Sequence, residues 1–131
     1  MIIGIGTDII DIRRIEKLLK TQGKKFEKRV FTDFERGVAK EKKGKQFAAY
    51  YAKRFAAKEA LAKALGTGIG ASLSFQDIEI YNHVNGLPAI LLNEKAKNVL
   101  IKKIGSRKKS DIHLSLSDEY PYAQAFVVIS A

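Results

Sequence analysis

A segment in the middle of the chain combines four charged residues with many alanines. The stretch "RFAAKEALAKALGTGIG", at 54–70, contains Arg54, Lys58, Glu59 and Lys63. When 47–65 is placed on a helix at about 100° per residue, Arg54 and Lys58 fall inside a stripe of aromatic and leucine side chains. An unpaired buried charge is costly. These two cations therefore either have anionic partners or extend to solvent at the edge of the stripe.

Glu59 and Lys63 have the i, i+4 spacing typical of a surface ion pair worth roughly 0.3–0.5 kcal/mol. The predicted strand at 2–10 adds an acid, Asp8, on the same face as Gly4 and Gly6, because side chains alternate along a strand. Glycines within a strand often mark the close approach of backbone or ligand. Asp8 beside them is a candidate metal ligand, or it simply caps or turns the chain before the next helix.

Three glycines follow the helix in the segment "GTGIG". Gly66 alone is an ordinary helix stop. Gly68 and Gly70 extend it into a loop whose backbone can approach a ligand. Phosphate-binding glycine loops normally precede a helix, so the loop alone indicates little about function.

The composition is that of a folded protein. The chain has 131 residues, of which 46% are hydrophobic, and we expect one domain over 1–131 with its own core. There is no cysteine, which suits a reducing cytoplasm. The N-terminal "MIIGIGTDII" has no basic leader, and Asp8 interrupts its apolar run. We therefore expect neither a signal peptide nor a membrane span.

The positive charge is concentrated in one part of the chain. The net charge is +10, and residues 13–45 hold 13 basic and 5 acidic residues, a net charge of +8. Such a field attracts polyanions, including nucleic acids, anionic lipids, phosphorylated ligands and acidic proteins. Charge alone does not choose among these partners.

Hydrophobic periodicity and capping residues predict alternating helices and strands. Asp11 is expected to cap the first helix and Gly23 to end it, while Thr32 and Glu35 have capping-box spacing. The dipeptide Asn85-Gly86 predicts a hairpin turn. The predicted strands are 2–10, 76–82, 88–92, 111–117 and 122–130, and the predicted helices are 11–19, 24–31, 32–43, 45–65 and 93–105. This mixed order indicates the α+β class.

Two motifs and their spacing resemble the small bacterial type of the 4′-phosphopantetheinyl transferase family, the holo-[acyl-carrier-protein] synthases. They are "GIGTDIIDIRRIE" near the N-terminus and "RFAAKEALAKAL" in the middle of the chain. The resemblance extends over the whole length through "VFTDFE", "NGLPAI" and "LSLSDEYPYAQAFVV". It implies a 4′-phosphopantetheinyl transferase-like fold, with an antiparallel sheet packed against a long central helix.

The resemblance also implies an activity and a set of site residues. The reaction transfers 4′-phosphopantetheine from coenzyme A to a serine of apo acyl carrier protein, for fatty acid biosynthesis, and releases adenosine 3′,5′-bisphosphate. By the family motifs, Asp8 and Glu59 bind Mg²⁺ and Lys63 lies near the reacting phosphate, as general base or charge stabiliser. The implied assembly is a homotrimer with coenzyme A between subunits.

Further contacts follow from this implied activity. Arg54 and Lys58 become candidate phosphate partners, which would explain cations on an apolar stripe. We also expect five further residues to make contacts. Gly66, Gly68, Gly86 and Pro88 are candidates for contacting the nucleotide end of coenzyme A, and Arg14 is the candidate for contacting the acidic carrier protein. Many family members have His where this chain has Asp118, so no role of a histidine carries over.

Two other classes of function remain as alternatives. The charge and the segment "KKIGSRKKS" suit a basic nucleic-acid-binding module. However, the basic segments lack interleaved aromatic residues for base stacking. A non-enzymatic adaptor for acidic proteins would leave Asp8, on the strand face cleared by Gly4 and Gly6, without a purpose.

Overall fold

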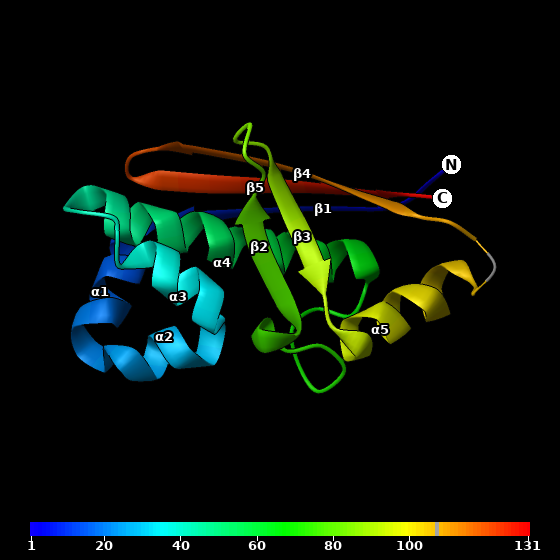
Figure 1. Ribbon diagram of the computed structural model, residues 1–131, viewed down its shortest axis with the longest axis horizontal. Helices are drawn as coiled ribbons and strands as arrows, with labels where there is room; N and C mark the ends of the chain where they lie inside the picture. The colour runs from blue at the N-terminus through cyan, green and yellow to red at the C-terminus, as the bar shows by residue number, and fades with distance from the viewer. Residues whose placement is uncertain (107) are drawn as a thin grey trace.

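The computed structural model describes residues 1–106 and 108–131 (Figure 1). Arg107, within the basic segment noted above, lies outside the described residues. In chain order the elements are β1 (Ile2–Asp11), α1 (Ile12–Gln22), α2 (Lys24–Val30), α3 (Asp33–Ala39), α4 (Lys45–Leu65), the 3₁₀ helix η1 (Phe75–Asp77), β2 (Ile78–Asn82), β3 (Pro88–Leu92), α5 (Glu94–Ile104), β4 (Asp111–Glu119) and β5 (Tyr122–Ser130).

Helix α4 occupies the centre of the molecule. An antiparallel sheet of order β1-β5-β4 lies along one side of it, and the separate antiparallel hairpin β2–β3 lies on the other (Figure 1). Helices α1, α2 and α3 cluster at one end, and α5 lies at the opposite end. This arrangement confirms the predicted α+β class with an antiparallel sheet packed on a long central helix.

The predicted capping residues explain most helix boundaries. The side chain of Asp11 accepts a hydrogen bond from the backbone N–H of Arg13, and Thr32 and Glu35 form a capping box. Helix α4 ends at Gly66, whose φ of 83° is left-handed. Helix α3 is shorter than predicted and ends at Ala39. The residues between α3 and α4, "KEKKG" at 40–44, offer no apolar side chain to bury, and a short helix needs such burial for stability.

The two glycines of β1 allow this strand to lie directly against the backbone of α4. A Cβ added at Gly6 would lie 1.8 Å from the carbonyl oxygen of Ala60, and one at Gly4 would lie 2.2 Å from that of Ala64. The alanines of α4 have the same effect, because they present little side chain toward the sheet. The glycines therefore accommodate a helix backbone, which is one of the two alternatives that the sequence left open.

Lys58 extends from the middle of α4 into the core, where its side chain is fully buried. Its Nζ donates hydrogen bonds to Oε1 of Glu35 at 2.7 Å and to the carbonyl oxygens of Val30 and Phe75 at 2.7 and 3.1 Å. Burial lowers the pKa of Lys58, while the charge of Glu35 opposes that effect.

Glu35 is the internal counter-charge that Lys58 requires. Its other carboxylate oxygen accepts the backbone N–H of Ile80 at 2.7 Å, so this ion pair joins α3, α4 and β2. The prediction that Lys58 contacts a phosphate of coenzyme A is wrong, because three hydrogen bonds within the core already occupy its three donors. The alternative that Lys58 extends to solvent is also wrong.

Among the described residues, no helix combines the length and apolar character needed to cross a membrane.

Replacing Gly6 with alanine should destabilise the protein, because the new methyl group would collide with the backbone of α4. We expect Gly6→Ala to lower the free energy of unfolding by about 1–3 kcal/mol or more, measured by urea denaturation. Gly37→Ala is the matched control, because an added Cβ there meets no atom within 4 Å. It should leave stability unchanged or raise it by up to about 1 kcal/mol. Equal stability of Gly6→Ala and the parent would contradict this packing.

Removing the ammonium of Lys58 should leave the charge of Glu35 buried without its partner. We expect Lys58→Met to lower the free energy of unfolding by about 3–5 kcal/mol in urea denaturation. The additional substitution Glu35→Gln should recover part of that loss, since it removes the uncompensated charge. Lys20→Met, at an exposed position near the end of α1, should change stability by no more than about 0.5 kcal/mol. A Lys58→Met protein as stable as the parent would refute the role of the buried pair.

Candidate active site

Asp8 and Lys63 meet where β1 crosses α4. Nζ of Lys63 lies 3.2 Å from Oδ1 of Asp8 and donates a hydrogen bond to the carbonyl oxygen of Thr7 at 3.0 Å. The side chain of Asp8 is only 17% exposed, whereas that of Lys63 is 53% exposed. Asp8 reaches the helix because it shares the face of β1 on which Gly4 and Gly6 lie.

Glu59 lies half-buried beside this pair. Burial raises the pKa of Glu59 above its usual value, and the charge of Asp8 raises that pKa further. Lys63 and Arg14 act in the opposite direction. The structure thus brings Asp8, Glu59, Lys63 and Arg14 into one region, as predicted, with two carboxylates close enough to repel each other.

Two such carboxylates fit a hard divalent cation. Mg²⁺ is commonly held by one or two carboxylates together with phosphate oxygens and water. A bound cation would relieve the repulsion through which Asp8 raises the pKa of Glu59. In the part of the chain that the structure describes, no group of three or more His, Asp or Glu side chains could hold a metal. A metal bound by Asp8 and Glu59 would therefore take its other ligands from substrate or water.

A cleft of about 540 Å³ opens beside Glu59. Its walls are largely apolar and include Phe26, Phe55 and Phe75, and its rim is basic. The guanidinium of Arg14 lies 5.9 Å from the centre of the Phe55 ring, within the range of a cation–π contact. The cleft thus offers apolar contact beside the two carboxylates, under a positively charged rim.

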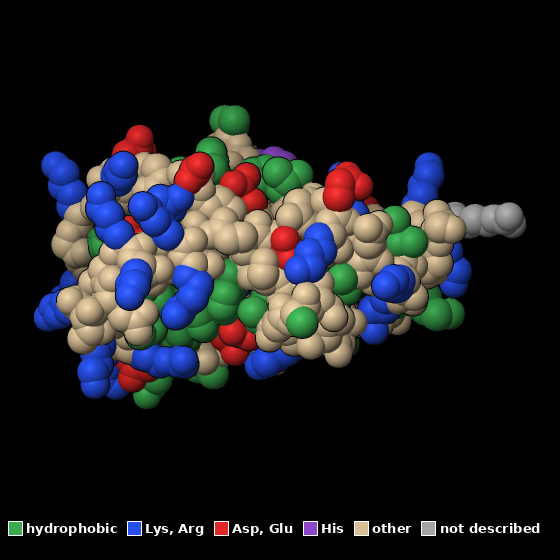
Figure 2. Space-filling view, turned by 90° about the horizontal axis from the view of Figure 1, so that it is seen from below, with side chains coloured by type: hydrophobic (Ala, Val, Ile, Leu, Met, Phe, Trp, Pro, Cys, Tyr) green, Lys and Arg blue, Asp and Glu red, His purple; other side chains and the backbone are tan. Residues whose placement is uncertain are grey.

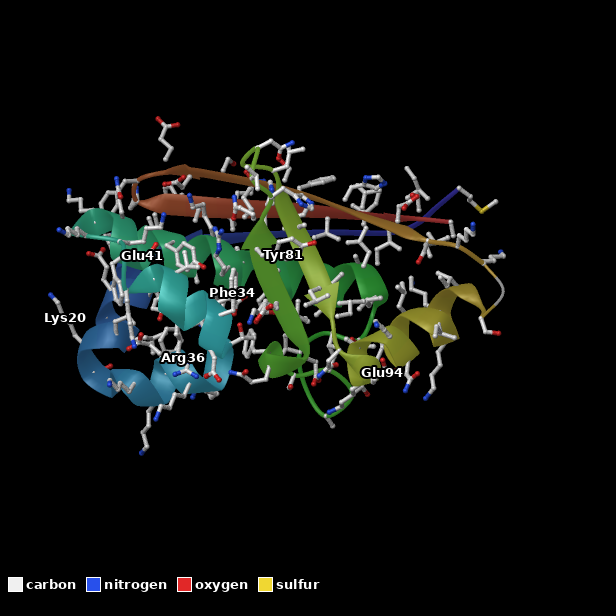
Figure 3. All side chains as sticks on the ribbon, in the orientation of Figure 1. Lys20, Phe34, Arg36, Glu41, Tyr81 and Glu94 are labelled. Carbon is white, nitrogen blue, oxygen red and sulfur yellow. The ribbon has the colours of Figure 1, made fainter. Side chains whose placement is uncertain are left out.

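Arg54 lines a second cleft, of about 580 Å³. The side chain is buried, its guanidinium lies 4.1 Å from the centre of the Tyr50 ring, and it donates a hydrogen bond to Asn82. Its Nε has no hydrogen-bond partner in the described structure. Phe34 of α3 and Tyr81 of β2, both labelled in Figure 3, also line this cleft.

The two clefts lie on different sides of α4. Arg54 and Glu59 are five residues apart, which separates them by about 140° around a helix. The cleft of Arg54 is bounded by α3, β2 and the end of β4, whereas that of Glu59 is bounded by α1, α2 and η1. Within one chain, the structure therefore does not bring Arg54 to the two carboxylates.

The remaining predicted contacts are separated in the same way. Gly66 and Gly68, with φ values of 83° and 64°, form the left-handed turn that ends α4. Gly86, with a φ of 91°, lies in the turn between β2 and β3, and Pro88 begins β3. The tip of this hairpin is remote from the end of α4 (Figure 1). The carbonyl oxygen of Gly86 accepts a hydrogen bond from Asn82, which connects it to the cleft of Arg54.

Three residues around Arg54 were missed as site residues by the sequence interpretation. They are Tyr50, Lys53 and Asn82, all of which line its cleft. The position of Arg54 on the apolar stripe indicated that it either has partners or extends to solvent. Nothing in the local pattern indicated that β2 would supply one of them.

Comparison with known proteins identifies the family. The sequence model of the 4′-phosphopantetheinyl transferase superfamily matches residues 4–125. A holo-[acyl-carrier-protein] synthase of Bartonella bacilliformis is 50% identical over 131 residues, which are 100% of this chain and 97% of that protein.

Two crystal structures extend the likeness to the fold. The holo-[acyl-carrier-protein] synthase of Neisseria meningitidis is 38% identical, with a TM-score of 0.86 and 100% of both chains covered. That of Bacillus anthracis, solved in complex with CoA (3′,5′-ADP), is 43% identical, with a TM-score of 0.81 and 98% and 96% of the two chains covered. The chain belongs to the 4′-phosphopantetheinyl transferase superfamily.

Proposed function

We propose that this chain transfers the 4′-phosphopantetheine group of coenzyme A to a serine of an apo acyl carrier protein. The observation that carries this proposal is the cluster of Asp8, Glu59 and Lys63, found in a chain whose relatives over its full length are holo-[acyl-carrier-protein] synthases. The second product is adenosine 3′,5′-bisphosphate. The holo carrier would serve fatty acid biosynthesis in the cytoplasm.

The chemistry is a displacement at phosphorus. The serine oxygen bonds to the phosphorus that carries pantetheine, the bond from that phosphorus to the bridging oxygen breaks, and the electron pair leaves with the nucleotide. Mg²⁺ held by Asp8 and Glu59 would neutralise negative charge on the pyrophosphate. Lys63 has an exposed ammonium at this position. It either stabilises the developing charge or, when deprotonated, accepts the serine proton.

We assign the nucleotide end of coenzyme A to Arg54, Gly66, Gly68, Gly86 and Pro88. Arg54 and Gly86 belong to the cleft on one side of α4, whereas Gly66 and Gly68 lie at its C-terminal end. A single coenzyme A can contact both groups together with Asp8 when they come from neighbouring chains. This geometry supports sites between subunits, and the resemblance to the family suggests that the assembly is a homotrimer.

The outward face of the three-stranded sheet supports the same assembly. Ile5 and Ile9 of β1 and Phe126 of β5 project from this face and are 56%, 64% and 43% exposed. No other described element covers the sheet on that side (Figure 1). Exposed apolar patches of this kind typically mark interaction surfaces, and a second copy of the chain would cover this one.

The acidic carrier protein would bind at the basic end of the molecule. Lys and Arg side chains gather over the end built by α1, α2 and α3 (Figure 2). Arg14 connects this surface to the reaction, because it lines the cleft beside Glu59 and its charge opposes the rise in the pKa of Glu59. The alternative function, a nucleic-acid-binding module without catalytic activity, is not supported by the comparisons, whose relatives are synthases.

A mass-spectrometric transfer assay tests the activity and its metal. Incubation with apo carrier protein, coenzyme A and Mg²⁺ should add one phosphopantetheine to the carrier, and EDTA should prevent the addition. Asp8→Ala and Glu59→Ala should each abolish transfer and weaken Mg²⁺ binding in calorimetry, because each removes a metal ligand. Urea denaturation should show both variants folded. An Asp8→Ala protein that keeps most of its activity would rule out this role of Asp8.

Reversing the charge of Arg14 tests the carrier surface. We expect Arg14→Glu to raise the KM for the carrier about tenfold at low salt and to leave the KM for coenzyme A nearly unchanged. Raising the salt concentration of the parent enzyme should have the same effect, because charges are screened over about 8 Å at physiological ionic strength. Lys109→Glu, an equal change of charge at an exposed site beyond α5, is the control. A parallel loss of affinity for both substrates in Arg14→Glu would exclude this docking surface.

A further inference from the structure

The cleft of Arg54 is lined by one acidic side chain as well as by several basic ones. Three basic side chains line it, those of Lys42, Lys53 and Arg54. Among the described residues that line the cleft, Asp118 near the end of β4 is the one acidic side chain. The excess of positive charge makes the cleft suitable for an anion, and Asp118 is placed to oppose the binding of one.

The buried floor of this cleft has an unsatisfied donor. Arg54 is 6% exposed, and its guanidinium is held against the ring of Tyr50 and by Asn82. Its Nε makes no hydrogen bond within the described structure. Buried donors without a partner are rare, and a charged guanidinium favours a phosphate oxygen as acceptor. The buried guanidinium therefore contributes a fixed positive charge to the floor of the cleft, which favours an anion such as a phosphate.

Asp118 pairs with a cation nearer the surface of the same cleft. Its Oδ1 lies 3.2 Å from Nζ of Lys53, and the two side chains are 38% and 28% exposed. Both are more exposed than Arg54, so this ion pair lies toward the rim while the unsatisfied donor lies toward the floor. Partly exposed ion pairs are weak and are readily exchanged for another partner.

We propose that Asp118 is an affinity-tuning residue, which occupies Lys53 and weakens the binding of a phosphate group in this cleft. The inference rests on the proposed function, in which the phosphate belongs to coenzyme A or to the product adenosine 3′,5′-bisphosphate. A phosphate that enters the cleft pairs with Lys53 in place of Asp118. The negative charge of Asp118 then remains close to the phosphate. When the nucleotide departs, Asp118 recovers Lys53. The exchange lowers affinity for the substrate and favours release of the product.

Asp118→Asn tests this role, because it removes the charge and keeps the shape. Calorimetry should show adenosine 3′,5′-bisphosphate binding about three- to tenfold more tightly than to the parent. Adenosine, which has no phosphate, should bind equally weakly to both. The additional substitution Lys53→Met should remove the part of this gain that comes from the freed ammonium. Glu119→Gln is the matched control, because it removes one negative charge at the adjacent exposed residue, which does not line this cleft.

Unchanged or weaker binding by Asp118→Asn would overturn the proposal, as would equal tightening by Glu119→Gln, which would reveal only an effect of net charge. Asp118→Ser should change the affinity in the same direction as Asp118→Asn, and thermal unfolding confirms that each variant is folded. The transfer assay separates this inference from the function on which it rests. If the parent transfers phosphopantetheine while Asp118→Asn binds the nucleotide no better, only the role of Asp118 fails. If the parent transfers nothing, the proposed function fails.

Discussion

The approach of β1 to the backbone of α4 is the contact on which both the core and the candidate site depend. Gly4 and Gly6 have no side chain to hold the strand away, and the carbonyl oxygens of Ala60 and Ala64 occupy the space that a Cβ would need. The same strand then carries Asp8 to the surface of the helix, where it meets Lys63. Close packing between two backbones thus sets the distance between the chemical groups.

The charges of α4 show how one helix separates structural from chemical tasks. Lys58 satisfies all its donors inside the core and helps to fix α3 and β2 around the helix. Glu59, the next residue along, faces the cleft beside Arg14. A buried ion pair seldom adds much net stability, because desolvation offsets the attraction between the charges. The role of this ion pair is to fix the position of α4, the helix that carries Glu59 and Lys63.

Within a single chain, neither cleft offers all the contacts that the proposed substrate requires. One cleft combines carboxylates with apolar walls, and the other combines cations with an unsatisfied guanidinium donor. A substrate with a reactive pyrophosphate at one end of its nucleotide and a further phosphate at the other needs both kinds of surface. The uncovered apolar face of the β1-β5-β4 sheet offers a way for neighbouring chains to bring them together.

Local signals in the sequence were sufficient for most of the secondary structure. Asp11, Thr32 and Asn93 cap helices as their types suggest, because capping involves atoms only a few residues apart. The predicted limits of α4 are those of the structure for the same reason, since Gly66 can adopt a left-handed conformation at little cost. The motifs also grouped Asp8, Glu59 and Lys63, which the structure places in one region, because a resemblance over the whole chain carries information about distant contacts.

The sequence by itself determined the elements and the family motifs, and it placed Arg54 and Lys58 where each needs either a partner or a path to solvent. The tertiary structure decided who those partners are. Glu35 is 23 residues from Lys58 and Asn82 is 28 residues from Arg54, so neither pairing has a signature in local periodicity. The tertiary structure also determined the role of the glycines of β1. A strand that leaves space for a ligand and a strand that leaves space for a helix show the same alternation of residues, so the sequence alone does not distinguish them. Such choices depend on which surfaces meet when the chain folds.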